Sequence, residues 1–487
     1  MNSWNGKNIH FVGIKGIGML GLAQLLEHEG AHISGSDTTE EFPSDIVLKN
    51  VGIHVKEFSR ENIGGNIDLL VYSSAYPPSH PEREEARTRS IPELSYAEAL
   101  EKYGENKKVI VITGTHGKTT TTALIAEIMR TGGLAPATLV GGIVRNWQNS
   151  ILLPNLAVRP LSEEKTEYLV VEGDEYQEKF ARFTPFRLVI TSFDYDHSDY
   201  YPTPESYREA FQKYITTHRA VPVIAKEDAE KLSLSVFSAP VDEDERIFSA
   251  ARFALPGEAY RKDALLAICF TRLLGVASET ILRALAGFKG VERRLDRLSP
   301  AHGEVIILND YAHHPDEIQA TLQAVKEQYR GRKIIAIFQP HTYTRTKAFL
   351  EAFSKAFESA DEVFFDEIYG SAREEKGEIT ARDLMEKTRA HHAKAALLKE
   401  AWPEDFLRKV RSEKNALVIT MGAGDIWQKA RTLSRAFFGE KEKELVMKSK
   451  MENCDESIRA RSFASILKRV KDWLFCRTYG SPIFALT

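Results

Sequence analysis

The residues best suited to chemistry lie in the segment 113–121, which reads TGTHGKTTT and directly follows the apolar run 109–112 (VIVI). Glycines allow backbone N–H groups to curve around phosphate oxygens, and the N-terminus of a following helix adds partial positive charge. Lys118 would neutralise the β- and γ-phosphates, and the hydroxyl of Thr119 or Thr120 could reach Mg²⁺. The loop is shorter than the standard G-x-x-x-x-G-K-[ST] pattern, but strand, glycines, lysine and threonines together predict a nucleoside triphosphate site.

Two candidate metal ligands, Glu172 and His197, follow neighbouring strand patterns. Glu172 closes the run 168–172 (YLVVE), and His197 lies shortly after 188–192 (LVITS). In a parallel sheet the carboxyl ends of the strands share one edge, which is also the edge of the phosphate loop. A carboxylate and an imidazole at that edge could hold Mg²⁺ against ATP oxygens.

A second glycine motif occurs near the N-terminus, where 16–21 (GIGMLG) follows the strand pattern 8–12. It matches G-x-G-x-x-G, and Asp37 stands at the end of the next predicted strand. A nicotinamide cofactor is the usual inference, but the motif alone indicates only that a phosphate-bearing nucleotide can approach the backbone. A tight turn that serves helix packing is the alternative.

Polar clusters follow two further apolar runs, at 309–315 (NDYAHHP) and 339–346 (QPHTYTRT). Ligands bind at such positions in parallel sheets. Arg345 could bind a carboxylate through two hydrogen bonds, or form a surface salt bridge. His313 and His314 are adjacent, so their side chains point apart, and no further Cys or His spacing supports a zinc site.

These side chains can meet only if sheets align the ends of the strands that precede them. Short β-rich runs alternate with helical periodicity, which predicts α/β layers with mostly parallel strands. A charged helical stretch is predicted at 92–106, and a length of 487 residues allows about three domains. We place a Rossmann-like domain, a central P-loop ATPase-like domain, a second Rossmann-like domain and a helical tail, in that order, at 1–106, 107–291, 292–440 and 441–487.

The tail is charged and lacks strand patterns. In 461–477 (RSFASILKRVKDWLFCR) apolar residues recur at three- and four-residue steps among basic ones, which predicts an amphipathic helix. Such a helix could dock on the third domain, or contact an anionic membrane surface or a protein partner. We expect the residues that carry the chemistry to lie before the tail.

Composition excludes several classes of protein. Lys and Arg number 65 and Asp and Glu 69, a net charge of −4, which argues against a surface built to coat nucleic acid. A hydrophobic content of 43% is enough for substantial cores. The three scattered cysteines offer no disulfide framework, and neither a long apolar run nor a signal-peptide pattern is found, so we expect a cytoplasmic protein.

Taken in order, these motifs resemble the Mur ligase family, the ATP-dependent amide-bond ligases of peptidoglycan precursor synthesis. The likeness covers residues 8 to about 435 and rests on TGTHGKTTTT, NDYAHHPDEI and FQPHTYTRTK, with GIKGIGMLGLAQLL, SGSD and GAGDIW in support. It implies three domains that bind, respectively, a UDP-sugar, ATP and an amino acid, without a redox cofactor. The cofactors implied are ATP and Mg²⁺, and the substrates implied are UDP-N-acetylmuramate and L-alanine.

The resemblance also implies roles for individual residues. Those that would bind ATP are Gly114, Thr115, His116, Gly117, Lys118, Thr119, Thr120, Arg293, Arg294 and Asp310. Those that would bind the UDP-sugar are Gly16, Gly18, Gly21, Asp37, Ser73 and Ser74. The metal ligands would be Thr119, Glu172 and His197. The amino acid would be bound by Tyr311, His313 and Arg345, and the catalytic residues would be Lys118, His313 and Arg345.

Some positions depart from the family pattern. A histidine–asparagine pair and a further asparagine usually follow a Pro-Gly and read adenine, but here the residues are Ala259, Tyr260 and Asp263. Base selectivity for ATP is therefore left open by the sequence. Phe211 stands where several members carry a carbamoylated lysine, which agrees with the alanine-adding branch, although Lys213 is close by.

Three alternatives remain at this point. A family member that recycles tripeptide onto UDP-N-acetylmuramate would share the first domain, but its C-terminal signature resembles EPRSNTMK rather than FQPHTYTRTK. A nicotinamide dehydrogenase would explain 16–21 but would leave TGTHGKTTT and DYAHHP without a role. A non-enzymatic nucleotide-binding scaffold would not explain Glu172 and His197.

Overall fold

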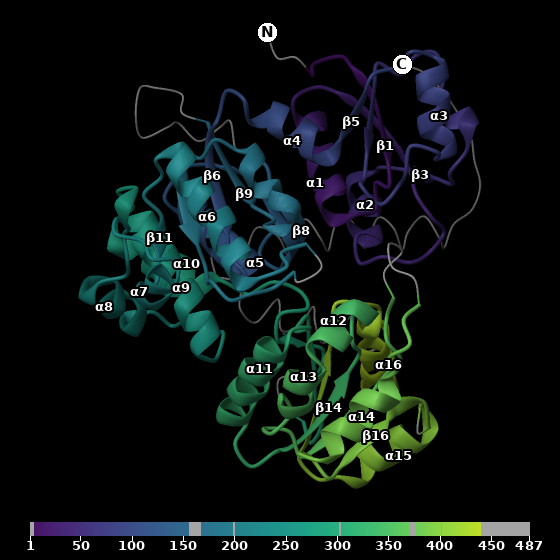
Figure 1. Ribbon diagram of the computed structural model, residues 1–487, viewed down its shortest axis with the longest axis vertical. Helices are drawn as coiled ribbons and strands as arrows, with labels where there is room; N and C mark the ends of the chain where they lie inside the picture. The colour runs from purple at the N-terminus through teal and green to yellow at the C-terminus, as the bar shows by residue number, and fades with distance from the viewer. Residues whose placement is uncertain are drawn as a thin grey trace, which may run out of the picture.

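A computed structural model of the chain describes residues 4–154, 167–197, 200–300, 303–370, 376–400 and 402–439. Three α/β bodies are visible, each built around one mostly parallel sheet (Figure 1). The predicted fold class is therefore confirmed, while the domain boundaries remain predictions. The predicted helix of the tail 441–487 lies outside the described residues. Within the described ranges no helix is both long enough and apolar enough to span a membrane.

The N-terminal sheet is wholly parallel, with strand order β3-β2-β1-β4-β5. Its strands are β1 (Asn8–Val12), β2 (His32–Ser36), β3 (Val55–Lys56), β4 (Leu69–Tyr72) and β5 (Glu93–Ser95). Its helices are α1 (Ile17–His28), α2 (Asp45–Val51), α3 (Pro81–Thr88) and α4 (Tyr96–Gly104). The helix predicted at 92–106 begins later than expected, because 93–95 pair with β4 and Ser95 then caps α4 reciprocally with Glu98.

The central sheet has the order β11-β10-β6-β9-β7-β8, and among the strand pairs of the described residues only the hairpin β7–β8 is antiparallel. Its strands are β6 (Lys108–Thr113), β7 (Ala137–Val144), β8 (Asn149–Leu152), β9 (Tyr168–Glu172), β10 (Arg187–Ile190) and β11 (Val223–Ile224). Its helices are α5 (Lys118–Thr131), α6 (Pro204–His218), α7 (Lys226–Lys231), α8 (Asp242–Ala250), α9 (Glu258–Leu273) and α10 (Ser278–Gly287). The middle strand β6 is apolar and buried because its alternate side chains enter hydrophobic clusters on both faces of the sheet.

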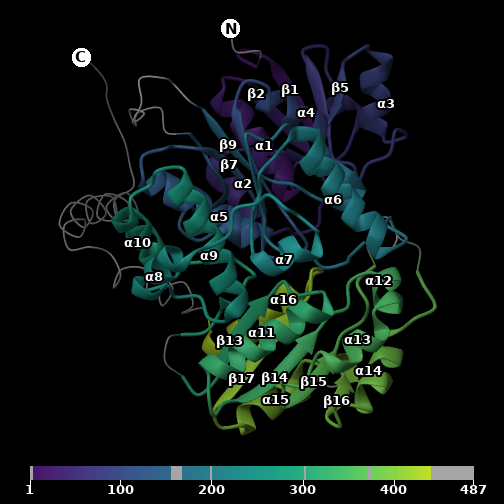
Figure 2. The same ribbon diagram turned by 60° about the vertical axis from the view of Figure 1, so that its left-hand side comes forward.

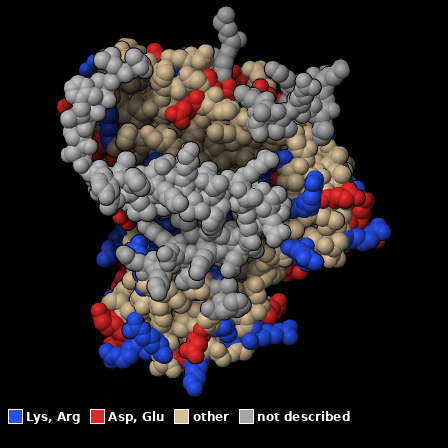
Figure 3. Space-filling view, turned by 180° about the vertical axis from the view of Figure 1, so that it is seen from behind, with Lys and Arg blue, Asp and Glu red and all other residues tan. Residues whose placement is uncertain are grey.

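The C-terminal sheet has the order β12-β13-β17-β14-β15-β16, with β12 antiparallel to β13 and the other pairs parallel. Its strands are β12 (Asp296–Arg297), β13 (Ile306–Asp310), β14 (Lys333–Phe338), β15 (Glu362–Phe365), β16 (Ala395–Leu397) and β17 (Ala416–Met421). Its helices are α11 (Pro315–Gln328), α12 (Tyr343–Ala348), α13 (Leu350–Lys355), α14 (Ala381–Arg389), α15 (Glu404–Ser412) and α16 (Ile426–Phe438). The surface of this domain carries intermixed basic and acidic side chains (Figure 3).

One continuous hydrophobic core runs through the N-terminal and central domains. Helix α1 lies against β7 and β8, where Gly21 lets Leu139 approach and Gln24 exchanges hydrogen bonds with Asn149 at 2.7 and 3.3 Å. The clusters of the C-terminal domain draw all their side chains from residue 295 onward. Two views show this domain set below the other two (Figures 1 and 2). The first two domains therefore share one large cluster, beside a second cluster that belongs to the central domain alone, and the third domain packs separately.

Candidate active site

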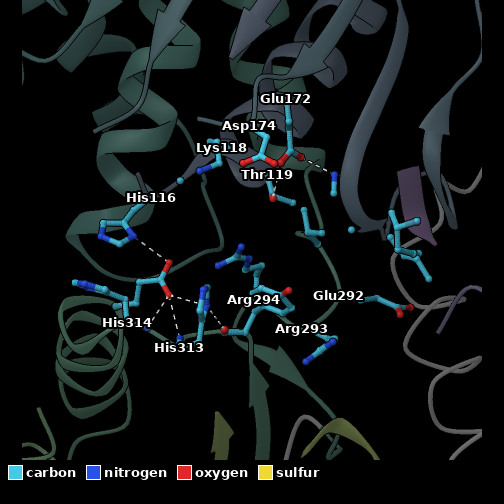
Figure 4. A pocket seen from close by; sticks show the side chains of 18 of the residues that line it. His116, Lys118, Thr119, Glu172, Asp174, Glu292, Arg293, Arg294, His313 and His314 are labelled. Carbon is cyan, nitrogen blue, oxygen red and sulfur yellow. Dashed lines mark hydrogen bonds and ion pairs between the residues drawn. The ribbon is translucent and has the colours of Figure 1, made fainter. Parts of the chain in front are cut away.

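A cleft of about 590 Å³ lies where the three domains meet. Its walls come from the loop before α1, the loop before α5, and the segments that follow β9, β13 and β14. Figure 4 shows side chains from the central and C-terminal domains pointing toward one another across it. The predicted residues that line it are Gly16, Thr115, His116, Gly117, Lys118, Thr119, Glu172, His197, Arg293, Arg294, Tyr311, His313 and Arg345.

The loop between β6 and α5 has a backbone that requires glycine at two positions. Gly114 and Gly117 have φ angles of 125° and 82°, which side chains disfavour. A Cβ on Gly114 would lie 2.6 Å from the hydroxyl of Thr191, and one on Gly117 would overlap the carboxylate of Asp263. The turn directs the N-terminus of α5 into the cleft, as a phosphate-binding loop requires.

Lys118 begins α5, and its ammonium group is held in place. Its Nζ donates to the carbonyl oxygens of Gly114 and Thr115 at 2.5 and 3.1 Å and pairs with Glu175 at 3.0 Å. Burial alone would lower the pKa of Lys118, but the Glu175 carboxylate more than offsets it and raises the pKa. The side chain is therefore a fixed positive charge beside the loop.

Glu172, at the end of β9, contacts the start of α5. Its carboxylate accepts from the Thr119 hydroxyl at 3.1 Å and from the Gly141 N–H at 2.5 Å. Burial raises the pKa of Glu172, since the charged form loses solvation, and these donors and Lys118 partly offset the rise. Two of the three predicted metal ligands, Glu172 and Thr119, are thus in direct contact.

His197 lies with a different pair of acids. Its Nε2 is 3.1 Å from Glu175, and single ligand atoms of Asp174, Glu175 and His197 all lie within 4.8 Å of one another. Sequence reasoning missed Asp174 and Glu175, although both directly follow β9 at the strand end where ligands gather. The cleft brings Glu172 and His197 together, but the close three-residue cluster forms around Glu175.

Two arginines of the segment before β12 enclose Tyr311. The guanidinium carbons of Arg293 and Arg294 lie 4.7 and 5.0 Å from the centroid of its ring. Arg293 also donates to the carbonyl oxygens of Gly422 and Gly424 at 2.8 and 3.0 Å. Arg293 is thus tied to the C-terminal domain, while Arg294 faces both the cleft and a second cavity.

Arg345, at the start of α12, pairs across the domain junction with Asp196 at 3.5 Å. Burial would raise the pKa of Asp196, but Arg345 and His197 hold it at about 2. Asp196 therefore stays ionised at neutral pH. The predicted carboxylate-binding arginine already has an acidic partner, which an incoming carboxylate would have to displace.

Glu317 of α11 connects the two domains at the other wall of the cleft. It accepts from His116 Nδ1 at 3.1 Å and from the backbone N–H groups of His313 and His314 at 3.0 and 3.3 Å. Burial would raise the pKa of Glu317, but His313 and His116 hold it well below the usual range. Glu317 was not predicted from the sequence, because its partner His116 lies in another domain.

The three glycines of the N-terminal motif lie in different surroundings. Gly16 lines the cleft, but a Cβ on Gly18 would lie 2.9 Å from the Tyr96 ring and one on Gly21 would lie 3.0 Å from Leu139. Gly18 and Gly21 therefore allow close packing, as the alternative interpretation of the motif holds. Contact of either with the UDP-sugar remains a prediction.

Asp37 lies behind this loop and accepts from the Lys15 N–H at 2.7 Å and from the Tyr76 hydroxyl at 3.2 Å. Ser73, in the turn after β4, accepts from the Ala75 N–H at 3.4 Å, and Ser74 follows it. Gly13, which sequence reasoning missed, has a φ of 86° and lies against the Tyr76 ring and Ser73.

A second cavity of about 260 Å³ lies on the far side of Gly117. Its lining includes the residues that depart from the family pattern, Ala259, Tyr260 and Asp263, as well as the predicted ATP ligands Thr120 and Asp310. Burial raises the pKa of Asp263 to about 7, although Thr121 and Arg294 oppose the rise. Asp310 accepts from the N–H groups of Leu295 and Ala312 at 2.6 and 2.8 Å.

Three α/β domains that converge on a phosphate loop, with a charged cleft between them, define an enzyme that brings a nucleoside triphosphate to substrates held by other domains. Family models match the chain in the same order: "Mur ligase family, catalytic domain" at 8–108, "Mur ligase middle domain" at 112–242 and "Mur ligase, glutamate ligase domain" at 293–424. The chain belongs to the Mur ligase family and is an ATP-dependent amide ligase.

Relatives of known name cover most of the chain. It is 34% identical to the UDP-N-acetylmuramate–L-alanine ligase of Desulfitobacterium hafniense over 88% of this chain and 99% of that protein. It is 31% identical to the Dictyoglomus turgidum enzyme of the same name, over 88% and 97%. A solved UDP-N-acetylmuramate–alanine ligase from Thermotoga maritima aligns with a TM-score of 0.70 at 27% identity, over 88% and 99%.

A solved murein peptide ligase from Psychrobacter arcticus shares the fold, with a TM-score of 0.64 at 21% identity over 89% of this chain and 99% of that one.

Proposed function

We propose that this protein joins L-alanine to the carboxylate of UDP-N-acetylmuramate, with ATP as phosphate donor, in peptidoglycan precursor synthesis. The observation that carries the proposal is the shared cleft, in which Gly16, Lys118 and Arg345 come from three different domains. Relatives that span nearly the same length carry the corresponding name. Both nucleotide substrates are intracellular metabolites, so the proposal places the enzyme in the cytoplasm.

Each domain binds one substrate in this proposal. The loop at Gly16, backed by Asp37, approaches the diphosphate of the UDP-sugar. The loop 114–120 holds the ATP phosphates, and the second cavity beyond Gly117 takes the nucleoside. Tyr260 offers a ring on which a base can stack, and Asp263 offers a carboxyl group in place of an amide.

The chemistry follows from the poor reactivity of a carboxylate, whose oxygen is a bad leaving group. Attack of the sugar carboxylate on the γ-phosphate of ATP gives an acyl phosphate and ADP. Lys118 offsets the repulsion between the two anions, since its charge is fixed beside the loop. The alanine amine then attacks the acyl carbon, and the tetrahedral intermediate expels phosphate.

The C-terminal domain supplies the amino acid in this scheme. Arg345 gives up its ion pair with Asp196 and binds the carboxylate of the amino acid instead. His313 Nδ1 lies 3.1 Å from the Tyr311 carbonyl oxygen and donates to it. In its neutral form His313 can accept, at Nε2, the proton that the alanine ammonium group must lose before it attacks.

We include Mg²⁺ as a cofactor, held by Thr119, Glu172 and His197, with Asp174 and Glu175 as further ligands. Oxygen donors suit this cation, and the atoms of Asp174, Glu175 and His197 lie close enough to share one ion. Bound there, Mg²⁺ would neutralise phosphate charge. Glu175 would then divide its charge between the ion and Lys118.

The test is ADP release with UDP-N-acetylmuramate present and amino acids supplied one at a time. L-Alanine is expected to give the fastest release, with no ADP formed when the sugar nucleotide is omitted. Preference for a tripeptide would indicate the recycling ligase instead. Reduction of a nicotinamide cofactor without ADP release would indicate a dehydrogenase. Absence of any turnover with all of these substrates would indicate a non-enzymatic scaffold.

A further inference from the structure

The imidazole of His314 is buried without a hydrogen-bond partner. The residue is 5% exposed, and neither ring nitrogen has a partner among the described residues. Desolvation lowers the pKa of His314, so the ring is neutral and keeps a lone pair. The nearest acidic atom, Asp316 Oδ2, lies 3.5 Å from Nδ1. A buried imidazole with no partner needs an explanation.

A second imidazole faces the first from the other domain. The rings of His116 and His314 lie 5.3 Å apart, and Figure 4 shows both at one end of the cleft. Glu317 is ionised and can only accept, so His116 donates to it through Nδ1–H. Nε2 of His116 too is buried without a hydrogen-bond partner. Burial would lower the pKa of His116, but Glu317 raises it, so a metal ion bound at Nε2 would take the place of a proton.

This arrangement is the one that orients histidine as a metal ligand. A carboxylate that accepts from one ring nitrogen fixes the tautomer and turns the other nitrogen toward the ion. Ligand atoms of His116, His314 and Asp316 all lie within 4.8 Å of one another. Tetrahedral zinc sites bring ligand atoms to about 3.3 Å, given bonds of about 2.0 Å, so small side-chain rotations suffice.

We propose that His116, His314 and Asp316 form a binding site for a transition-metal ion of the Zn²⁺ type, with Glu317 as the carboxylate that orients His116. Two imidazoles and one carboxylate suit Zn²⁺ or Co²⁺, whereas Mg²⁺ prefers oxygen ligands. The site differs from the cluster of Asp174, Glu175 and His197, where two of the three ligands are acids.

The ion would connect two domains. His116 belongs to the phosphate loop, and His314 and Asp316 lie at the start of α11. The C-terminal domain has its own core, so a metal bridge at this point would add a strong link where side-chain contacts such as His116–Glu317 and Arg345–Asp196 now connect the two. Binding should therefore raise the unfolding temperature.

The test is a Co²⁺ titration of the full-length protein in excess Mg²⁺, followed by the visible absorption of the bound ion. We expect one Co²⁺ per chain with the intense bands of four- or five-coordination, and displacement by Zn²⁺. His314→Ala and Asp316→Ala should each weaken binding by at least about tenfold. The Asp316 side chain is 67% exposed, so its removal leaves the packing intact if His314→Ala fails to fold.

Two controls locate the ion. His391→Ala removes an exposed imidazole elsewhere in the C-terminal domain, and Asp174→Asn alters the other cluster. Neither should change the affinity, and Zn²⁺ alone should raise the unfolding midpoint of the wild type more than that of Asp316→Ala. No binding by the wild type, equal binding by Asp316→Ala, or loss of binding in Asp174→Asn would each overturn the proposal.

Discussion

The two glycine loops of this molecule connect a strand to a helix in the same way but differ in what their glycines do. In the central loop, Gly114 and Gly117 both adopt positive φ, and Lys118 follows at once as the first helical residue. In the N-terminal loop, Gly13 adopts positive φ, whereas Gly16 has a φ of −57°. Only the central loop places a charged side chain at the helix start.

The residue behind each loop differs as well. Asp37 accepts hydrogen bonds from the Lys15 N–H and the Tyr76 hydroxyl. Asp263 lies against Gly117, and burial raises its pKa to about 7. A glycine spacing therefore describes a turn, while the surrounding charges decide which phosphate chemistry the turn can support.

The largest effect should come from exchanging the lysine of each loop for alanine. Lys118→Ala should lower kcat by about 10³-fold, because the fixed charge that faces the transferring phosphate is lost. Lys15→Ala, which breaks a hydrogen bond to the Glu40 carbonyl oxygen and an ion pair with Asp45, should mainly raise KM for the sugar nucleotide. Steady-state kinetics with each substrate varied would measure both. Equal losses of kcat would remove the distinction between the loops.

The next largest effect should come from a matched pair of glycine substitutions, one in each loop. Gly117→Ala should lower activity by about 100-fold and reduce the unfolding temperature, because its φ is 82° and Asp263 occupies the space of a side chain. Gly16→Ala should keep its stability, since no heavy atom lies closer than 3.5 Å to the added Cβ. Kinetics and thermal unfolding of both variants provide the test. A stable and fully active Gly117→Ala would contradict it.

The metal requirement should belong to the central loop alone. Glu175→Gln should raise the Mg²⁺ concentration for half-maximal rate by roughly tenfold, because it removes a charge shared by Lys118 and His197. Glu172→Gln, which alters another proposed ligand, should shift the titration as well, since Glu172 contacts Thr119. If only Glu172→Gln shifts the Mg²⁺ titration, the cluster around Glu175 is not the site.

The smallest effect concerns the pH dependence of stability. The raised pKa of Asp263 means that the folded state holds a proton between about pH 4 and 7 that the unfolded chain releases. Stability therefore falls as pH rises through that window. Asp263→Asn should remove this slope and raise the unfolding midpoint by a few degrees at pH 8, with a smaller difference near pH 4. Parallel curves for the two proteins would contradict the assignment.

Local patterns in the sequence predicted much of this site. The phosphate loop could be recognised because its strand, glycines and lysine are contiguous in 109–121. The short strand β5 was missed because its three residues pair only through β4. The packing roles of Gly18 and Gly21 could not be read from spacing, since Tyr96 and Leu139 come from other elements.

Local sequence patterns could not predict contacts between distant segments. Lys118 and Glu175 are 57 positions apart, Asp196 and Arg345 are 149 apart, and His116 and Glu317 are 201 apart. The spacing of the adjacent histidines at 313–314 did not predict a metal site, because the imidazole that faces His314 is that of His116 in another domain. Tertiary structure, rather than residue type, creates these pairs.

The shared hydrophobic core of the first two domains has a consequence for how the protein denatures. Side chains from α1 and from β7 and β8 pack as one cluster, so the N-terminal domain cannot lose its core without exposing that of its neighbour. The C-terminal domain keeps separate clusters. Heating should therefore melt the chain as two cooperative units rather than three, and amide hydrogens on either side of the β7–α1 contact should exchange with similar protection.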